Sequence, residues 1–307
     1  MRNRTNSAAK PFLKWAGGKT QLLPAIQSFL PDEIKNENLV YVEPFVGSGA
    51  VLFWMLTQFK NLKKAVINDI NTDLINTYRM IATSPEKLIA ILDNWQKEYH
   101  CLNEEKRKEY YYACRNLYNS RKSSMETQAA LFIFLNRTCF NGLYRVNKNN
   151  LFNVPIGSYK TPAICDKENI LAASNALQKV EILNVDFEET LNYAGDNTFF
   201  YLDPPYKPLS NTSSFNSYAK DEFNDDEQIR LKNFCDKLNM LGHKWLLSNS
   251  DVKGENKENN FFDDLYSGFN ISRVKAKRII NANPEKRGEL NELLITNYPY
   301  EEALSVA

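Results

Sequence analysis

The sequence lacks the features that mark disulfide-stapled and membrane-spanning proteins. Its five cysteines stand at positions 101, 114, 139, 165 and 235, so they form no Cys-x-x-Cys pair and fit a reduced compartment such as the cytosol. The longest apolar run, Ala129 to Leu135, is far shorter than the roughly 20 residues that span a bilayer. The polar N-terminus has no apolar segment behind it that directs export. We therefore expect a cytoplasmic protein with no membrane role.

Histidine is scarce, and the charges nearly cancel. The two histidines, His100 and His243, show no ligand spacing, so we expect no metal. The formal net charge is +1, but residues 97–150 hold ten Lys/Arg against five Asp/Glu, and residues 273–292 hold six against three. Charge runs of this kind are common on solvated surfaces, and they also suit a negatively charged partner such as nucleic acid.

Short apolar runs alternate with helical stretches along the chain, which is typical of a parallel sheet covered by helices. Several of these runs end in a polar or Gly/Pro-rich turn, where open α/β sheets bind their ligands. The sequence therefore predicts an α/β fold with a site at the ends of its strands. The expected strands are residues 40–43, 65–68, 181–185, 198–202, 244–247 and 293–296.

More than a hundred residues, from 69 to 180, separate the second and third expected strands. This interval is too long for one crossover and is mostly helical in pattern, with a buried helix expected over 125–136. After that helix, Asn141-Gly142 and Asn149-Asn150 predict turns around a β-hairpin. We interpret the interval as an inserted subdomain within a larger domain. The expected boundaries are 76–165 for the insertion, and 1–75 with 166–307 for the larger domain.

A glycine-rich segment directly follows the first expected strand. Glu43-Pro44-Phe45-Val46-Gly47-Ser48-Gly49 stands between that strand and a helix expected near Ala50. Glycines there allow a tight turn and bring backbone N–H groups close to a ligand at the helix N-terminus. Asp69, at the end of the next strand, is placed to accept the hydroxyls of a ribose. Gly-x-Gly alone also occurs in ordinary turns, but the order strand, turn, helix, strand, acid favours a nucleoside pocket.

A second constellation, Asp203-Pro204-Pro205-Tyr206, follows the expected strand 198–202. The two prolines fix the backbone and remove N–H donors, which leaves a rigid corner with acceptors facing outward. The exocyclic amine of adenine is a poor nucleophile because its lone pair is delocalised into the ring. The carboxylate of Asp203 and the carbonyl of Pro204 can localise that pair by accepting the N–H bonds, while Tyr206 stacks on the base. A generic proline-rich loop explains any one of these residues more easily than all four in order.

These segments together closely resemble the Dam-type adenine-N6 DNA methyltransferases, and most of all the modification enzymes of GATC-specific restriction systems. The resemblance covers nearly the whole chain. It is carried by Phe12-Leu13-Lys14-Trp15-Ala16-Gly17-Gly18-Lys19, by Glu43 to Gly49 and Asp203 to Tyr206, and by residues 141–147, 152–155, 208–218 and 247–250.

The resemblance implies an S-adenosylmethionine-dependent methyltransferase fold: Rossmann-like α/β, with a mixed sheet and helices on both faces. It also implies that the insertion is a mainly helical DNA-recognition subdomain with a β-hairpin. The implied activity is that of a site-specific DNA-methyltransferase (adenine-specific) from a prokaryote or phage, acting within GATC on an adenine flipped out of duplex DNA. A restriction endonuclease acting on the same site is a possible partner.

The resemblance further assigns residues to the cofactor S-adenosylmethionine. They are Trp15, Lys19, Phe45, Gly47, Gly49, Asp69, Ile70, Asp186, Phe187 and Asp203. Phe45 and the two glycines are expected along its methionine side, and Asp69 at its ribose. Ile70 and the Asp186-Phe187 pair are expected at its adenine ring. Taken singly, Trp15 and Phe187 also fit core aromatics, and Lys19 a surface lysine.

Similar enzymes read their site with a hairpin in the major groove, which gives the insertion a purpose. The candidate DNA contacts are Lys14, Phe140, Asn141, Leu143, Arg145 and Pro155. Arg145 suits a guanine edge, and the other polar members suit phosphate or base contacts. Leu143 and Pro155 suit a thymine methyl, and Phe140 suits insertion into the stack that the flipped base leaves. For Phe140 and Leu143, packing within the hairpin is an equal alternative.

Other activities account for less of the sequence. Methylation of cytosine at C5 needs a cysteine nucleophile, typically in a Pro-Cys pair, and the chain has no Pro-Cys. Enzymes acting on cytosine N4 usually present Ser-Pro-Pro-Tyr, and those acting on glutamine or ribosomal RNA usually present Asn-Pro-Pro-Tyr. A dinucleotide-dependent oxidoreductase leaves Asp203 to Tyr206 unexplained. A catalytically inert DNA-binding protein leaves both motifs unexplained.

Overall fold

The computed structural model describes residues 8–15, 17–206, 223–254, 257–277 and 289–300. Within them lies a seven-stranded sheet of order β3-β2-β1-β4-β5-β7-β6. Strands β1 to β5 pair in parallel, whereas β7 is antiparallel to both β5 and β6, so the sheet is mixed. The strands are β1 (Leu39–Glu43), β2 (Leu62–Asn68), β3 (Val180–Leu183), β4 (Thr198–Leu202), β5 (Lys244–Ser250), β6 (Asn270–Lys277) and β7 (Glu289–Thr296).

Five of these strands include the runs that the sequence predicts, and β6 is an addition. The exception, β3, ends at Leu183, two residues before the predicted end, where the side chain of Asn68 binds the N–H and the carbonyl of Val185. In β6, only Ile271 and Val274 among residues 270–275 are apolar, and the strand lies at the edge of the sheet. A search for short continuous apolar runs passes over such a segment. Strand β6 nevertheless pairs with β7 along its whole length, from Asn270 opposite Thr296 to Lys277 opposite Glu289.

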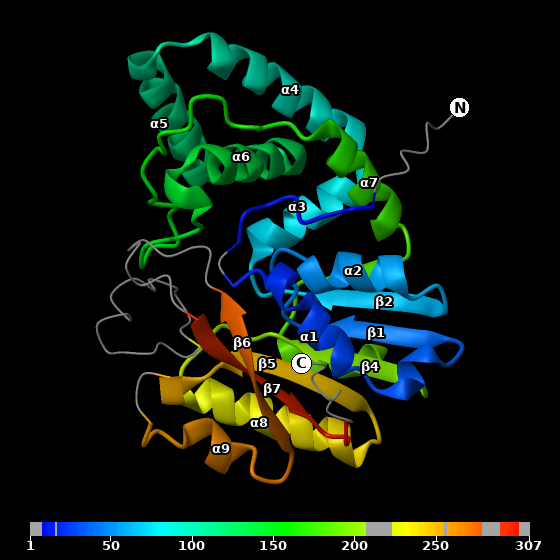
Figure 1. Ribbon diagram of the computed structural model, residues 1–307. Helices are drawn as coiled ribbons and strands as arrows, with labels where there is room; N and C mark the ends of the chain where they lie inside the picture. The colour runs from blue at the N-terminus through cyan, green and yellow to red at the C-terminus, as the bar shows by residue number, and fades with distance from the viewer. Residues whose placement is uncertain (1–7, 16, 207–222, 255–256, 278–288, 301–307) are drawn as a thin grey trace, which may run out of the picture.

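Helices cover both faces of the sheet, as expected (Figure 1). Neighbouring residues of one strand separate onto the two faces, so that Tyr41 packs in one hydrophobic cluster and Val42 in the other. The first cluster includes residues of α1 (Leu23–Ser28), α2 (Ala50–Gln58), α3 (Thr72–Thr83) and α7 (Lys167–Leu177). The second includes residues of α8 (Asp225–Met240) and α9 (Phe261–Leu265). The fold is thus Rossmann-like.

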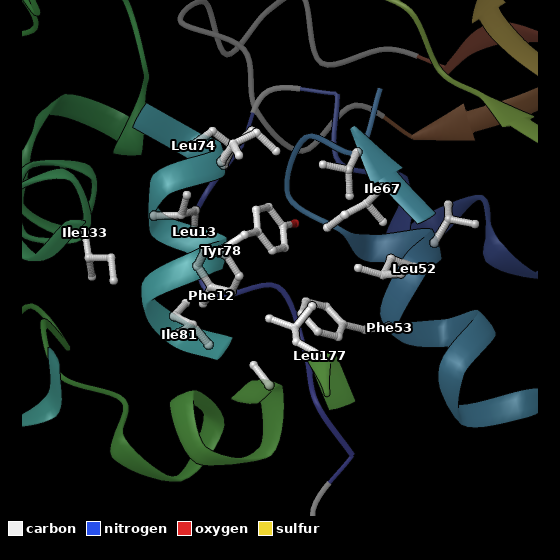
Figure 2. Close-up of a cluster of buried hydrophobic side chains, with 14 of the residues drawn as sticks. Phe12, Leu13, Leu52, Phe53, Ile67, Leu74, Tyr78, Ile81, Ile133 and Leu177 are labelled. Carbon is white, nitrogen blue, oxygen red and sulfur yellow. The ribbon is translucent and has the colours of Figure 1, made fainter. Parts of the chain in front are cut away.

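The N-terminal segment is fixed between α2 and α3 (Figure 2). The ring of Phe12 meets the ring of Tyr78 edge to face at 4.8 Å and that of Phe53 at 6.4 Å. Phe12 and Leu13 are buried, and Arg137 donates to the carbonyl of Phe12 at 2.8 Å. Burial of these side chains stabilises the segment by a few kcal/mol in total, on the order of 2 kcal/mol each. The segment that follows is thereby brought to the glycine-rich turn.

Between β2 and β3 the chain is mainly helical, as the sequence predicts. Helix α6 (Met125–Thr138) lies against α3, α4 (Pro85–Cys101) and α5 (Glu104–Ser120). Asn103 and Ser124 each accept a backbone N–H of the first turn of the helix that follows them, α5 and α6 respectively. One hydrophobic cluster runs from the sheet through α3 to α6, so the division at residues 76 and 165 stays a prediction. None of the described helices is long and apolar enough to cross a membrane.

The expected β-hairpin is present only in reduced form. Instead of two strands, the structure has two isolated antiparallel bridges, Val146 with Phe152 and Cys139 with Ile156. Around the first bridge, the N–H of Asn147 donates to the carbonyl of Leu151 at 2.9 Å, and that of Asn153 to the carbonyl of Arg145 at 3.1 Å. The outward-facing backbone groups of Phe152 bind Asn119 of α5, which accepts the N–H at 2.8 Å and donates to the carbonyl at 3.0 Å. The expected turn at Asn149-Asn150 is confirmed by the left-handed φ of 56° at Asn150.

Candidate active site

The glycine-rich segment forms a tight turn between β1 and α2. Gly47 and Gly49 have φ of 48° and 75°, in the left-handed region that favours glycine. A Cβ on Gly49 would lie 2.4 Å from the hydroxyl of Tyr78, and a Cβ on Gly47 would lie 3.2 Å from the ring of Trp15. Tyr78 donates to the carbonyl of Gly47 at 3.0 Å, which holds the turn against α3. Both positions therefore require glycine, for conformation and for space.

Asp69 lies at the end of β2, beside this turn, as expected. Its Oδ2 accepts the N–H of Gly47 at 3.1 Å, and its Oδ1 accepts the N–H of Asn71 at 2.9 Å. Burial raises the pKa of the carboxyl to about 6, against the opposing effect of these two N–H donors. The next residue, Ile70, is 70% exposed. The acid and an exposed apolar side chain thus stand together at the carboxyl end of the strand.

Trp15 lies against the same turn. Its ring stacks on that of Tyr144, with centroids 5.4 Å apart and planes at 18°, and the ring of Phe132 lies 6.3 Å away. The indole is therefore supported from the insertion on one side while its edge faces Gly47. Trp15 therefore fits both interpretations: its ring packs against other aromatic rings, and it also borders the predicted cofactor pocket.

Asp186 and Phe187 stand after β3, across the carboxyl edge of the sheet from the turn. Phe187 is buried and its ring lies 5.3 Å from that of Phe45. The carboxylate of Asp186 caps the following turn by accepting the N–H of Glu188 at 3.0 Å. It is also paired with the guanidinium of Arg230, which lies 4.3 Å from the centroid of the Phe187 ring. The two expected residues are thus brought beside Phe45 and held by a cation that the sequence did not indicate.

Asp203 begins the loop after β4, next to β1 in the sheet. Its Oδ1 lies 2.8 Å from the ammonium of Lys19 and accepts the hydroxyl of Ser248 at 3.1 Å. Burial raises the pKa of Asp203, and the charge of Lys19 and the two hydrogen bonds oppose that rise. Both donors bind Oδ1, and in the part of the chain that the structure describes neither reaches Oδ2. The expected catalytic carboxylate is therefore oriented by two side chains.

Tyr206 closes the same loop. Its hydroxyl accepts a hydrogen bond from Lys19 and donates one to Glu292, while the ammonium lies 4.3 Å from the ring centroid. Burial and the nearby carboxylates raise the pKa of the hydroxyl, so it stays neutral. Gln228 donates to the carbonyl of Pro205 at 3.4 Å, and Pro204 is buried. Contacts with Lys19, Glu292 and Gln228 thus hold this corner, and its rigidity stays a prediction from the two prolines.

The candidate DNA contacts gather where the insertion meets the N-terminal segment. Phe140, Asn141 and Pro155 are exposed, and the N–H of Phe140 donates to the carbonyl of Pro155 at 2.9 Å. The ammonium of Lys14 donates to the hydroxyl of Tyr159 at 3.1 Å. Gly142, between these elements, lies so close to the Lys14 side chain that a Cβ there would come within 2.4 Å of it.

Two other candidates are less exposed. Leu143 packs against the hydrophobic cluster, which agrees with the packing alternative for this side chain. Arg145 is half-buried and its Nε donates to Oδ1 of Asn153 at 2.8 Å. The candidates thus differ in exposure: Phe140, Asn141 and Pro155 are exposed, whereas the other three are partly buried.

Much of the basic charge in residues 97–150 is used inside the fold. Arg107 donates to the backbone carbonyls of three residues, Arg121 pairs with Asp73, and Arg137 binds the N-terminal segment. Because these arginines bind groups of the protein itself, the number of basic residues in this run only partly supports its interpretation as a nucleic-acid surface. The described residues contain no group of three or more His, Cys, Asp or Glu side chains that could hold a metal.

Sequence reasoning missed the roles of Ser248, Glu292 and Arg230. Ser248 follows a predicted apolar run at the edge where ligands bind, so its position was available from the sequence. Glu292 lies on antiparallel β7 and Arg230 on α8, and neither position carries a local signal. Residues 208–218, which carry part of the sequence resemblance, lie outside the described residues.

Comparison with known proteins agrees with this arrangement of motifs. The chain is 50% identical over 293 residues to the type II methyltransferase M.MjaIII of Methanocaldococcus jannaschii, covering 94% of this chain and 99% of that protein. It is 41% identical over 294 residues to the type II methyltransferase M1.LlaDCHI of Lactococcus lactis subsp. cremoris, with coverage of 94% and 95%. It is 33% identical over 291 residues to the DNA adenine methylase of Escherichia coli K12, with coverage of 94% and 96%.

The family comparison confirms the resemblance of the motifs. The model of the D12 class N6 adenine-specific DNA methyltransferases matches residues 15–280, which include the glycine-rich turn, Asp69 and the loop from Asp203 to Tyr206. The chain therefore belongs to the D12 class of N6 adenine-specific DNA methyltransferases.

Proposed function

We propose that this DNA adenine methyltransferase moves the methyl group of S-adenosylmethionine onto the N6 amine of an adenine flipped out of duplex DNA. The observation that carries the proposal is the orientation of Asp203. Its Oδ1 is held by Lys19 at 2.8 Å and by Ser248 at 3.1 Å, and we assign Oδ2 to the incoming amine. An acceptor fixed in advance costs no reorganisation when the base arrives.

The residues around the glycine turn fit S-adenosylmethionine. Gly47 and Gly49 let the turn pack closely against Trp15 and Tyr78 while it leads into the N-terminus of α2. Asp69 offers a carboxylate for the ribose, and exposed Ile70 offers an apolar surface for a purine. Phe45 and Phe187 form an aromatic pair on the other side. Trp15, Lys19 and Asp186 complete the set of residues that we assign to the cofactor.

The chain's own residues prepare the target amine. When bound, S-adenosylmethionine supplies an electrophilic methyl group on a positively charged sulfur. Asp203 and the Pro204 carbonyl accept the two N–H bonds of the amine, which localises its lone pair, and Tyr206 stacks on the base. Pro204 and Pro205 keep this corner rigid. The methylated nitrogen is acidic and releases its proton, so Asp203 need act only as an acceptor during transfer.

We further propose that the enzyme reads GATC through the surface that includes Lys14, Asn141 and Arg145. The bond from Arg145 to Asn153 uses Nε, whereas guanine is read by the terminal nitrogens of the fork. Exposed Phe140 suits the gap left by the flipped adenine, and Leu143 and Pro155 suit a thymine methyl. Residues 76–165 then form the DNA-recognition subdomain, and residues 1–75 with 166–307 form the catalytic domain.

A role in restriction and modification is the biological setting we favour. Two of the similar proteins are type II methyltransferases by name, and such enzymes protect DNA from an endonuclease that acts independently on the same site. We place the enzyme in the cytoplasm with the DNA. An epigenetic mark without a nuclease is the second possibility, since another similar protein is named a DNA adenine methylase.

The test is to incubate the protein with labelled S-adenosylmethionine and unmethylated duplex DNA, and to locate the label by sequencing. Label on adenine N6 within GATC is expected, and single-stranded DNA should take up less. Label on cytosine, or no label at all, would contradict the proposed activity. Label on adenine in another sequence would contradict only the proposed GATC specificity. Asp203→Ala should abolish transfer and keep DNA binding. Asp196→Ala, at an exposed loop position, is the matched control.

A further inference from the structure

Glu292 reaches the active site from outside every motif described above. It lies on β7, and the antiparallel pairing with β5 sets it opposite Ser250. Its side chain is only 17% exposed. One oxygen, Oε2, accepts the hydroxyl of Tyr206 and lies 3.7 Å from the ammonium of Lys19. The carboxylate of Glu292 therefore contacts two side chains of the site: Lys19, which pairs with Asp203, and Tyr206, which ends the catalytic loop.

The contacts of Lys19 set the charge of this site. Its ammonium is 4% exposed and lies between two carboxylates, at 2.8 Å from Asp203 and 3.7 Å from Glu292. The neighbouring Tyr206 stays neutral because its pKa is raised. Lys19 therefore interacts with two carboxylates rather than with that of Asp203 alone. Opposite charges at these distances interact strongly where water is mostly excluded.

We propose that Glu292 is a positioning residue of the methyl transfer, acting through Tyr206 and Lys19. It fixes the ring of Tyr206 by its hydroxyl, and it shares the charge of Lys19 so that Asp203 keeps its attraction for the amine. Methylation turns a neutral amine into a cation that must release a proton, and a carboxylate near the site stabilises that cation. The inference rests on the proposed function of Asp203.

The variant Glu292→Gln tests the charge while keeping size and hydrogen bonding. We expect kcat to fall about 10- to 100-fold, with KM for DNA changed less than about threefold. Glu292→Asp keeps the charge and should recover part of the loss. The matched control is Glu181→Gln, which removes a carboxylate from β3 at the opposite side of the sheet, where it pairs with Lys64. That control should keep wild-type kinetics.

Binding without DNA gives a second readout. Calorimetric titration of Glu292→Gln with S-adenosylmethionine and with neutral S-adenosylhomocysteine should show a greater loss of affinity for the cationic ligand, about 3- to 10-fold more. A cycle with Tyr206→Phe should show non-additive effects on kcat, because the two side chains act through one hydrogen bond.

The outcomes separate this inference from the function on which it rests. If Asp203→Asn is inactive while Glu292→Gln keeps wild-type kcat and ligand preference, only the role of Glu292 is overturned. Equal loss of affinity for both ligands together with a lower melting temperature would also overturn it, since a purely structural role predicts that pattern. A fully active Asp203→Asn enzyme would overturn both proposals.

Discussion

The ammonium of Lys19 lies 2.8 Å from Oδ1 of Asp203, and the hydroxyl of Ser248 binds the same oxygen at 3.1 Å. Lys19 comes from the N-terminal segment and Ser248 from β5, so two distant parts of the chain orient one carboxylate. Both donors bind Oδ1, and we propose that Oδ2 accepts the substrate amine. The electrostatics of the site follow from it.

Replacing Lys19 by glutamine should make activity depend on higher pH. Burial raises the pKa of Asp203 and Lys19 opposes the rise, so loss of the cation moves this pKa further up. The ionised form of Asp203 then exists only at higher pH. At pH 7 we expect kcat/KM to fall about 10- to 100-fold, with partial recovery as the pH is raised. The measurement is the pH profile of kcat/KM, and an acidic limb identical to that of the wild type would contradict the expectation.

At neutral pH, ionised Asp69 should lower the stability of the folded protein and favour cofactor binding. Its pKa is raised from 3.8 to about 6 in the folded protein, so its contribution to stability is present below pH 4 and is lost as the pH rises through 6. Asp69→Asn should therefore raise the free energy of unfolding at pH 8, by about 1 to 2 kcal/mol after the loss of one hydrogen bond. Affinity for S-adenosylmethionine should fall in the same variant.

Denaturant unfolding and calorimetric titration at pH 8 check these two expectations for Asp69. Asp196→Asn, exposed and distant from the turn, serves as the control. In the wild type, cofactor affinity should weaken as the pH falls through 6, because a protonated Asp69 no longer accepts both ribose hydroxyls. Unchanged stability together with unchanged affinity in Asp69→Asn would refute the assignment.

Gly49→Ala should damage the turn for two separable reasons. The added Cβ would lie 2.4 Å from the hydroxyl of Tyr78, and φ of 75° strains any other residue. We expect a loss of about 2 to 3 kcal/mol in the free energy of unfolding. Tyr78→Phe in the same chain removes the clash and should restore part of the loss, while the backbone strain remains. Gly195→Ala, where nothing lies within 4 Å of the new Cβ, should be close to neutral.

Substitution of Arg145 should change the choice of methylated sequence more than the rate of methylation. Bidentate contact with guanine is worth about 1 to 3 kcal/mol of discrimination, and lysine does not reproduce the planar fork. Arg145→Ala and Arg145→Lys should therefore both methylate substrates altered at one base pair of GATC relatively better than the wild type does. Kinetics on a panel of duplexes, each changed at one position, check this. Equal discrimination in all three enzymes would exclude a reading role for Arg145.

The placement of the glycine turn, Asp69 and Asp203 could be predicted from the sequence because these residues follow parallel strands. The carboxyl ends of β1, β2 and β4 lie at one edge of the sheet, so the glycine turn, Asp69 and Asp203 must meet there once the strands pair in this order. The turn between strand and helix indicated glycine at positions 47 and 49, where the structure shows positive φ and close neighbours. Most of the predicted strands were recognisable because burial on both faces makes them largely apolar, whereas the edge strand β3 is mostly half-buried.

Tertiary structure decided what no local pattern encodes. Glu292 enters the site through the register of antiparallel β7, which sets it opposite Ser250, and Arg230 reaches Asp186 from a separate helix. The segment around Phe152 is attached to α5 by the side chain of Asn119. In each case the partner is a side chain far away in the sequence. The sequence by itself therefore determined the chemistry at the strand ends, and packing decided which charges and hydrogen bonds surround it.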